Sequence, residues 1–203
     1  MSTARRFTLF STAGLAVMLV IGLLLGYAAG FLTPHSSSPG DTSPEAGFAR
    51  DMSAHHAQAV AMGMLAQSKG NKVEVRGFGS DIALTQQAQI GMMDQWLRDW
   101  GVNPNTEAAP MSWMPDGMNQ LDNGLMPGMA TQAEMDALAA ASGPAFDRLF
   151  VQMMIKHHLG GIHMVDGVLS QTHNGDVTWL ADAIKSGQQG EVTALQNLQK
   201  QLG

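Results

Sequence analysis

The pattern of apolar residues along positions 45–203 predicts helices and no strands. In the last part of the chain, apolar residues recur at steps of three and four, which is the period of a buried helix face. These positions are Val177, Leu180, Ile184, Leu195, Leu198 and Leu202. A break at 174–176 precedes them, with Asp176 as the expected N-cap. Two earlier helices are predicted, from Pro44 to Ser68 and from Val73 to Trp100.

The chain also repeats itself. Residues 48–101 align without a gap on residues 150–203 at a constant offset of 102, which places His55-His56 on His157-His158. Each unit has the form of a helical hairpin with one apolar stripe to bury. Two such hairpins predict an all-α fold, a four-helix bundle made by internal duplication.

The pattern also divides the chain into segments. Residues 7–32 carry no charge and follow Arg5 and Arg6, which predicts a single transmembrane helix with a cytoplasmic N-terminus. Residues 1–32 are therefore a signal anchor, or a signal peptide if this segment is cleaved. The remaining segments are a flexible linker (33–44) and the duplicated domain (45–203), with its first hairpin (45–101), methionine-rich crossover (102–130) and second hairpin (131–203).

Location and composition restrict the partners and ligands that the domain can have. The domain is expected outside the cytoplasmic membrane, or secreted if the leader is removed. A net charge of −6 argues against nucleic acid as a partner, because phosphate binding needs clustered Lys and Arg. The absence of cysteine excludes disulfides and thiolate ligands. The chain is nevertheless rich in the other nitrogen and sulfur ligand types, with 7 His and 16 Met.

The first predicted helix of each unit carries His and Met on one face, about 120° wide. This face holds Met52, His55, His56 and Met62 in the first unit and Met154, His157, His158 and Met164 in the second. The first methionine of each unit lies only about 4.5–6 Å along the axis from the histidines, so one ion could contact both. The second methionine lies about 10.5 Å away and is assigned to a second layer or to packing. Ordinary core packing of these side chains is the alternative interpretation.

Polar residues interrupt the apolar stripe of the partner helices. Gln188 and Glu191 do so in the last helix, and Gln86 and Gln89 occupy the equivalent positions in the first unit. Buried polar groups are costly unless they are paired. We therefore expect these side chains to hold and orient the imidazoles, with or without a metal. A plain layer of polar hydrogen bonds is the alternative.

The crossover adds further thioethers, which are soft ligands that favour Cu(I). They are Met111, Met114, Met118, Met126 and Met129, with Met135 just beyond. Packing across the bundle would explain them equally well. The third long helix is expected to start near Thr131 or after Gly143-Pro144. His35, His163 and His173 are expected to be exposed and outside the site.

Three motifs of this chain resemble a bacterial family of extracytoplasmic domains of unknown function, number three hundred and five. They are FARDMSAHHAQAVAM, MPGMATQAEMDAL and FDRLFVQMMIKHHLGGIHM. The resemblance covers about residues 45–203 and implies a ferritin-like four-helix fold with a periplasmic or cell-surface role in copper binding. It implies the paired histidines, the four methionines of their face and Glu191 as functional residues. The first unit departs from the family pattern with Gln89 in place of glutamate, and the second has Gly161 where alanine is usual.

Together these features predict an extracytoplasmic protein that binds, buffers or delivers copper, as Cu(I) rather than Cu(II), without catalysis. A copper-delivery partner is possible in principle, and the sequence does not identify one. A ferritin-like metal-dependent oxidoreductase is the first alternative, but di-iron centres of that kind use about four glutamates, and the expected core offers Glu191. A helical bundle with a structural or interaction role and no metal is the second alternative.

Overall fold

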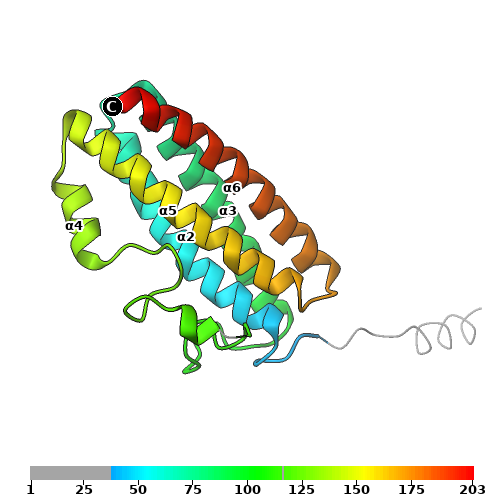
Figure 1. Ribbon diagram of the computed structural model, residues 1–203. Coiled ribbons are helices and arrows are strands. Elements are labelled where there is room, and N and C mark those ends of the chain that lie inside the picture. The colour runs from blue at the N-terminus through cyan, green and yellow to red at the C-terminus, as the bar shows by residue number, and fades with distance from the viewer. Residues whose placement is uncertain (1–37, 116) are drawn as a thin grey trace, which may run out of the picture. The chain divides into compact units, whose positions relative to one another are not determined.

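The computed structural model describes residues 38–115 and 117–203, and helices are the regular secondary structure of this part. Its five α-helices are α2 (Pro44–Lys69), α3 (Val73–Asp99), α4 (Gln132–Ala140), α5 (Gly143–Leu169) and α6 (Gly175–Leu202). Figure 1 shows the four long helices side by side, and the described residues form no strand. The all-α prediction is therefore confirmed.

The expected membrane anchor lies outside the described residues, as does the first part of the linker with His35. Within residues 38–115 and 117–203, none of the helices combines the length and the apolar character that a bilayer crossing requires. The transmembrane helix at residues 7–32 stays a prediction from the sequence.

The helix starts follow ordinary capping chemistry, with one correction. Ser43 caps α2 by accepting from the backbone N–H of Ala46 at 3.2 Å. The cap of α6 is Asn174, which accepts from the backbone N–H groups of Asp176 and Val177. The prediction of Asp176 as the N-cap was wrong because the helix begins at Gly175. Asp176 lies in the first turn instead, where a carboxylate favours the positive end of the helix dipole.

The two starts expected for the third long helix are the starts of two different helices, α4 and α5. Thr131 caps the short helix α4 in a capping box with Glu134. Extended backbone at Ala141 and Ser142 then separates α4 from α5. Helix α5 begins at Gly143, whose φ of +57° is a conformation that glycine adopts without strain.

Helix α2 packs on α3, α5 packs on α6, and the two hairpins meet through α2 and α5. The early part of α2 shares an apolar cluster with the late part of α5, so these two helices are antiparallel (Figure 1). Met52 and Met164 belong to this cluster, whereas Met62 and Met154 belong to the other one. The fold therefore groups an early methionine of one unit with a late methionine of the other.

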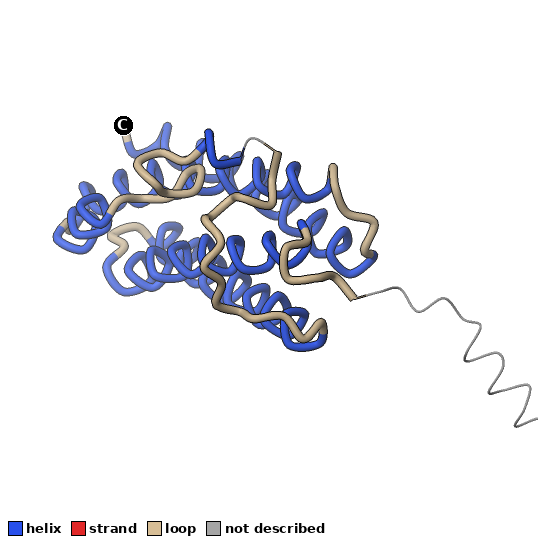
Figure 2. Tube along the Cα trace, turned by 90° about the horizontal axis from the view of Figure 1, so that it is seen from below, coloured by secondary structure: helices blue, strands red, loops and turns tan. Residues whose placement is uncertain are grey.

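The crossover between the hairpins is loop over most of its length, as Figure 2 shows. It contains one short 3₁₀-helix, η1 (Gly117–Gln120). Met111 and Met126 are buried in the cluster that contains Met52, whereas Met118 is 56% exposed. Part of the methionine-rich crossover thus packs as core.

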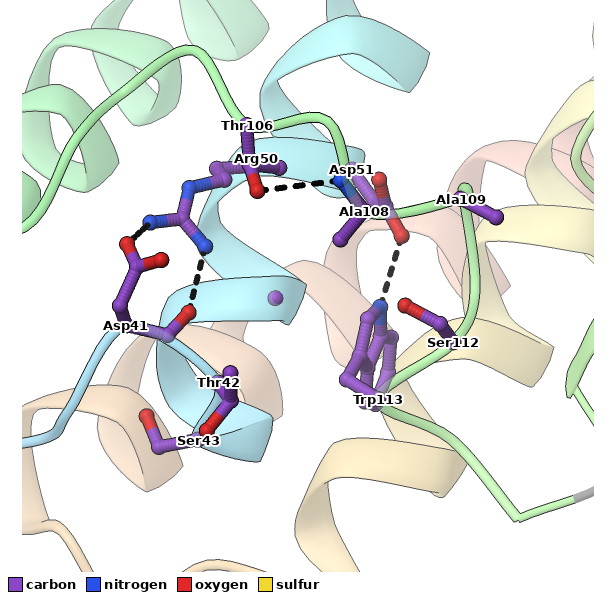
Figure 3. Close-up of a pocket in the computed structure, with 11 residues that line it drawn as sticks. Asp41, Thr42, Ser43, Arg50, Asp51, Thr106, Ala108, Ala109, Ser112 and Trp113 are labelled. Carbon is purple, nitrogen blue, oxygen red and sulfur yellow. Dashed lines mark hydrogen bonds and ion pairs between the residues drawn. The ribbon is translucent and has the colours of Figure 1, made fainter.

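Two adjacent residues of α2 tie the start of the crossover and the start of α2 together. Asp51 accepts from the backbone N–H of Met111 and from the indole N–H of Trp113, both at 2.7 Å. Figure 3 shows the second of these hydrogen bonds. Arg50 donates to the backbone carbonyl of Asp41 at 2.8 Å and forms an ion pair with its carboxylate. Burial raises the pKa of Asp51, and the two hydrogen bonds it accepts oppose that rise. A surface pocket of about 260 Å³ lies among these residues.

Candidate metal centre

The four paired histidines are fully buried, with exposed fractions of 0%. The ring centroids of His55 and His157 lie 3.8 Å apart, with the ring planes tilted by 36°. The ring of His56 lies 6.5 Å from that of His55, and the ring of His158 lies 6.4 Å from that of His157. The duplication therefore brings the four imidazoles together in the interior, with His55 and His157 in contact between the two hairpins and His56 and His158 beside them. We call these four rings the histidine row.

Three of the four rings have their Nε2 atom within hydrogen-bonding distance of an oxygen acceptor. These contacts are His55 to the Pro127 carbonyl (3.0 Å), His56 to Gln89 Oε1 (2.8 Å) and His158 to Glu191 Oε2 (2.5 Å). A carbonyl or carboxylate oxygen can only accept, so in the neutral rings Nε2 carries the hydrogen and Nδ1 carries a lone pair. This is the arrangement in which an outer residue orients a metal-binding imidazole.

The Nδ1 atoms of all four rings are buried and have no hydrogen-bond partner among the described residues. His157 lacks a partner at Nε2 as well. Buried nitrogen atoms without partners are rare in folded proteins, because each one loses its interaction with water. A cation with affinity for neutral nitrogen would satisfy them, so the donor set fits a metal ion.

Burial keeps the rings of His55, His56 and His157 in the neutral form that binds metal. It lowers the pKa of His55 to about 4 and that of His56 to about 3, and the neighbouring imidazoles add to the effect. The pKa of His157 is lowered well below its ordinary value for the same reasons. At neutral pH these side chains are uncharged, so an incoming ion has no proton to displace.

Thioethers lie on both sides of the row. Along α2, Met52 precedes the histidines and Met62 follows them, and Met154 and Met164 hold the equivalent places on α5. All four are fully buried. No three His, Asp or Glu side chains of the described part are grouped as a ready metal site. Nitrogen and oxygen atoms alone thus form no closed cage, and sulfur is the remaining soft ligand at hand.

Glu191 has a different position from the other predicted site residues. Its side chain is 26% exposed and contacts His158. Gln89 contacts His56 in the same way in the first unit. Both residues therefore hold a ring in place from outside. The expectation that polar residues of the partner helices orient imidazoles is confirmed for these two residues, whereas Gln86 and Gln188 contact no imidazole by a hydrogen bond.

A segment of the crossover covers one side of the row, and the sequence interpretation missed it. Residues 126–130 lie against α5, where a methyl group at Gly160 would overlap the Pro127 carbonyl. Gln58 of α2 donates to the Ala130 carbonyl at 2.8 Å and accepts from its N–H at 2.7 Å. We call residues 126–130 the lid. The glycine at 160, two residues after a buried His pair, was the available signal.

Glycines allow the lid and the side-chain amide of Gln188 to pack closely against α5. Gly128 has a φ of +79°, and a Cβ there would lie 2.5 Å from the Lys156 carbonyl. Gly161 faces the other way, and its Cβ would lie 2.6 Å from Oε1 of Gln188. Of the two adjacent glycines, Gly160 thus leaves space for the lid and Gly161 leaves space for the Gln188 side chain.

The other two histidines of the described part lie outside the row. His163 and His173 are both exposed, as predicted. His163 contacts Gln120 of the crossover through a hydrogen bond.

Comparison with known proteins places this chain in a family. The chain belongs to the family described as Domain of unknown function (DUF305), whose sequence profile matches residues 45–199. A DUF305 protein from Streptomyces coelicolor, provisionally described as secreted, has a similar crystal structure with a TM-score of 0.74. It is 38% identical, over 81% of this chain and 96% of that one. A comparison with the curated proteins found no match.

Two further solved structures are similar. A DUF305 fragment from Deinococcus radiodurans is 28% identical, with a TM-score of 0.67 over 80% of this chain and 99% of that one. CopM in a silver-bound form is 25% identical, with a TM-score of 0.59 over 76% of this chain and 93% of that one. CopM structures with Cu(I) and with Cu(II) also match this chain.

Proposed function

We propose that this chain is an extracytoplasmic protein that binds a soft metal ion, copper as Cu(I), in the buried row of imidazoles. The observation that carries the proposal is the set of four buried Nδ1 atoms without hydrogen-bond partners. The copper- and silver-bound forms of CopM support it. We further propose that the four long helices form a ferritin-like bundle that encloses the ion.

The ligand chemistry favours Cu(I) over harder ions. The row offers neutral nitrogen, and the buried methionines on each side offer neutral sulfur. Such ligands suit a soft ion, whereas Mg²⁺ and Ca²⁺ need several oxygen ligands. A single positive charge also costs less to bury than a double one. Met52, Met62, Met154 and Met164 are the thioethers proposed to complete the coordination.

The location follows from the sequence and from a relative. Residues 7–32 are proposed to anchor the chain in the cytoplasmic membrane, or to be removed as a signal peptide. The Streptomyces coelicolor relative, provisionally described as secreted, supports an extracytoplasmic domain. There the protein would buffer copper or pass it to a delivery protein, without catalysis.

The positions of Asp147 and Glu191 do not support the alternative that this protein is an oxidoreductase. Asp147 is buried in the described part, but it accepts from the backbone N–H groups of Asn71 and Lys72 at 2.8 and 3.0 Å. Glu191 is already engaged with His158. A carboxylate-rich di-iron centre would need about four such groups at the row.

Replacement of His157 by leucine gives a sharp test of the binding site. His157 makes no hydrogen bond through either ring nitrogen, so His157→Leu exchanges an unsatisfied polar ring for an apolar side chain and should fold at least as stably as the native chain. Loss of a ligand should weaken Cu(I) binding by at least about tenfold, since even loss of an outer partner costs that much. Competition with a Cu(I) chelator measures the affinity.

The matched control is His163→Leu, the same exchange at an exposed position. It should leave the Cu(I) affinity unchanged. Native affinity in His157→Leu would refute the proposed site. A native protein whose melting temperature does not respond to Cu(I) would favour a structural bundle, because a ligand of the folded state must stabilise it.

A further inference from the structure

A narrow cleft between α3 and α6 opens beside the imidazole row, on a face that the lid does not cover. Its volume is about 60 Å³. The residues that line it are Thr85, Gln86, Gln89, Ala183, Ile184, Gly187, Gln188 and Glu191. Gln89 and Glu191 are also the residues that hydrogen-bond His56 and His158. Gln89 and Glu191 therefore connect the cleft to the rings of His56 and His158.

Two glutamines in this cleft carry unsatisfied polar atoms. Gln86 and Gln188 are each only 3% exposed. Oε1 of Gln86 and both amide atoms of Gln188 have no hydrogen-bond partner among the described residues. Such atoms are costly to bury, so their position in a cleft points to a ligand or to water that passes through it. The space is large enough for one or two water-sized groups.

The charge of the cleft suits a cation. Glu191 is the acidic residue of the lining, and Gln86, Gln89 and Gln188 line the same cleft. No Lys or Arg lines the cleft. A negative charge in a narrow cleft raises the local concentration of cations and their rate of arrival.

The lid packs closely on the other side of the row. Gly160 leaves no space for even a methyl group beside the Pro127 carbonyl. Gln58 closes the end of the lid with two hydrogen bonds to Ala130. An ion that reaches the row through this side would have to displace the whole segment.

We propose that the α3–α6 cleft is the access site for the metal ion, where amide and carboxylate oxygens replace water around a monovalent soft cation before it passes to the imidazoles. This inference rests on the proposed function and adds the route. Oxygen ligands bind soft ions weakly, so the ion is not trapped in the cleft. Gln86 and Gln188, whose amide oxygens have no partner among the described residues, act as transient ligands along this route. Glu191 supplies the negative charge beside them.

Two glycines of α6 provide a matched test. Gly187 lines the cleft and Gly190 does not, yet both are exposed, and an added Cβ would meet no atom within 4 Å at either position. Leucine is a better helix former than glycine, so Gly187→Leu and Gly190→Leu should both fold. Only the first places a bulky side chain over the cleft.

The experiment measures silver ion binding and release by the full-length chain in stopped-flow competition with a chromophoric chelator. Gly187→Leu should slow association and dissociation alike by about tenfold, which corresponds to a barrier raised by about 1.4 kcal/mol. The affinity should stay native because both rates change together. Gly190→Leu should exchange silver at the native rate.

The outcomes separate the route from the function. Native exchange rates in Gly187→Leu would overturn the access site while leaving the binding site standing. Equal slowing in both variants would overturn it too, since the cleft would then not be the cause. A native chain that does not bind silver would overturn both proposals.

Discussion

Metal-free protein should lose about 4 kcal/mol of its unfolding free energy when the pH falls from 7 to 5. Burial lowers the pKa of His55 to about 4 and that of His56 to about 3. In the unfolded chain both titrate near 6.5, so between pH 6.5 and about 4 the unfolded state binds more protons than the folded state. Stability therefore falls as the pH falls through this window, by about 2 kcal/mol for each ring at pH 5.

Two other groups modify this result. His157 acts in the same direction, because its pKa is also lowered by burial. Burial raises the pKa of Asp51, which stabilises the fold slightly as the pH falls and opposes the histidines. For a domain of this size the net effect corresponds to a melting temperature lower by about 10 °C.

Chemical denaturation and thermal melts at a series of pH values measure this loss. His157→Leu should reduce the pH dependence, whereas His173→Leu, at an exposed position, should leave it unchanged. A stability that is equal at pH 5 and pH 7 would mean that the imidazoles are hydrated in solution. The conclusion that the histidine row is shielded from water would then be wrong.

Gly160→Ala should destabilise the fold by about 2 kcal/mol. The added methyl group would overlap the Pro127 carbonyl, so α5 or the lid must shift. A displaced lid would lose the hydrogen bond from His55 to Pro127 and the two between Gln58 and Ala130, each contributing about 1 kcal/mol. The higher helix propensity of alanine offsets only about 1 kcal/mol of this loss.

Gly91→Ala is the control, because Gly91 is an exposed glycine in α3 with no atom within 4 Å of an added Cβ. This variant should gain about 0.5–1 kcal/mol. Urea denaturation of the two variants beside the native chain decides the matter. Equal stabilisation by both alanines would show that the lid does not rest on α5.

The histidine row could be predicted because each step in that prediction uses local information. The 102-residue offset aligns the two His pairs, and the helical period places each pair on the buried face of its helix. Gln89 and Glu191 were also found as polar breaks in an apolar stripe, since buried polar groups need partners. The structure gives both of them an imidazole partner.

The grouping of the methionines needed the tertiary structure. The repeat makes Met52 equivalent to Met154, but the antiparallel packing of α2 and α5 places Met52 in one cluster with Met164. Periodicity within a helix does not reveal the direction of its neighbour. The lid was missed for a related reason, because an irregular segment such as 126–130 has no period from which its position can be inferred.

The central claim is that the buried Nδ1 atoms bind a soft metal, and long-range ¹H–¹⁵N NMR of the imidazole rings tests it most directly. In the metal-free protein, His55, His56 and His158 should carry their hydrogen on Nε2. Addition of silver ions should shift the Nδ1 signals of the paired histidines and leave that of His173 unchanged. Unchanged signals from the buried rings, with silver shifting only those of the exposed histidines, would contradict the account.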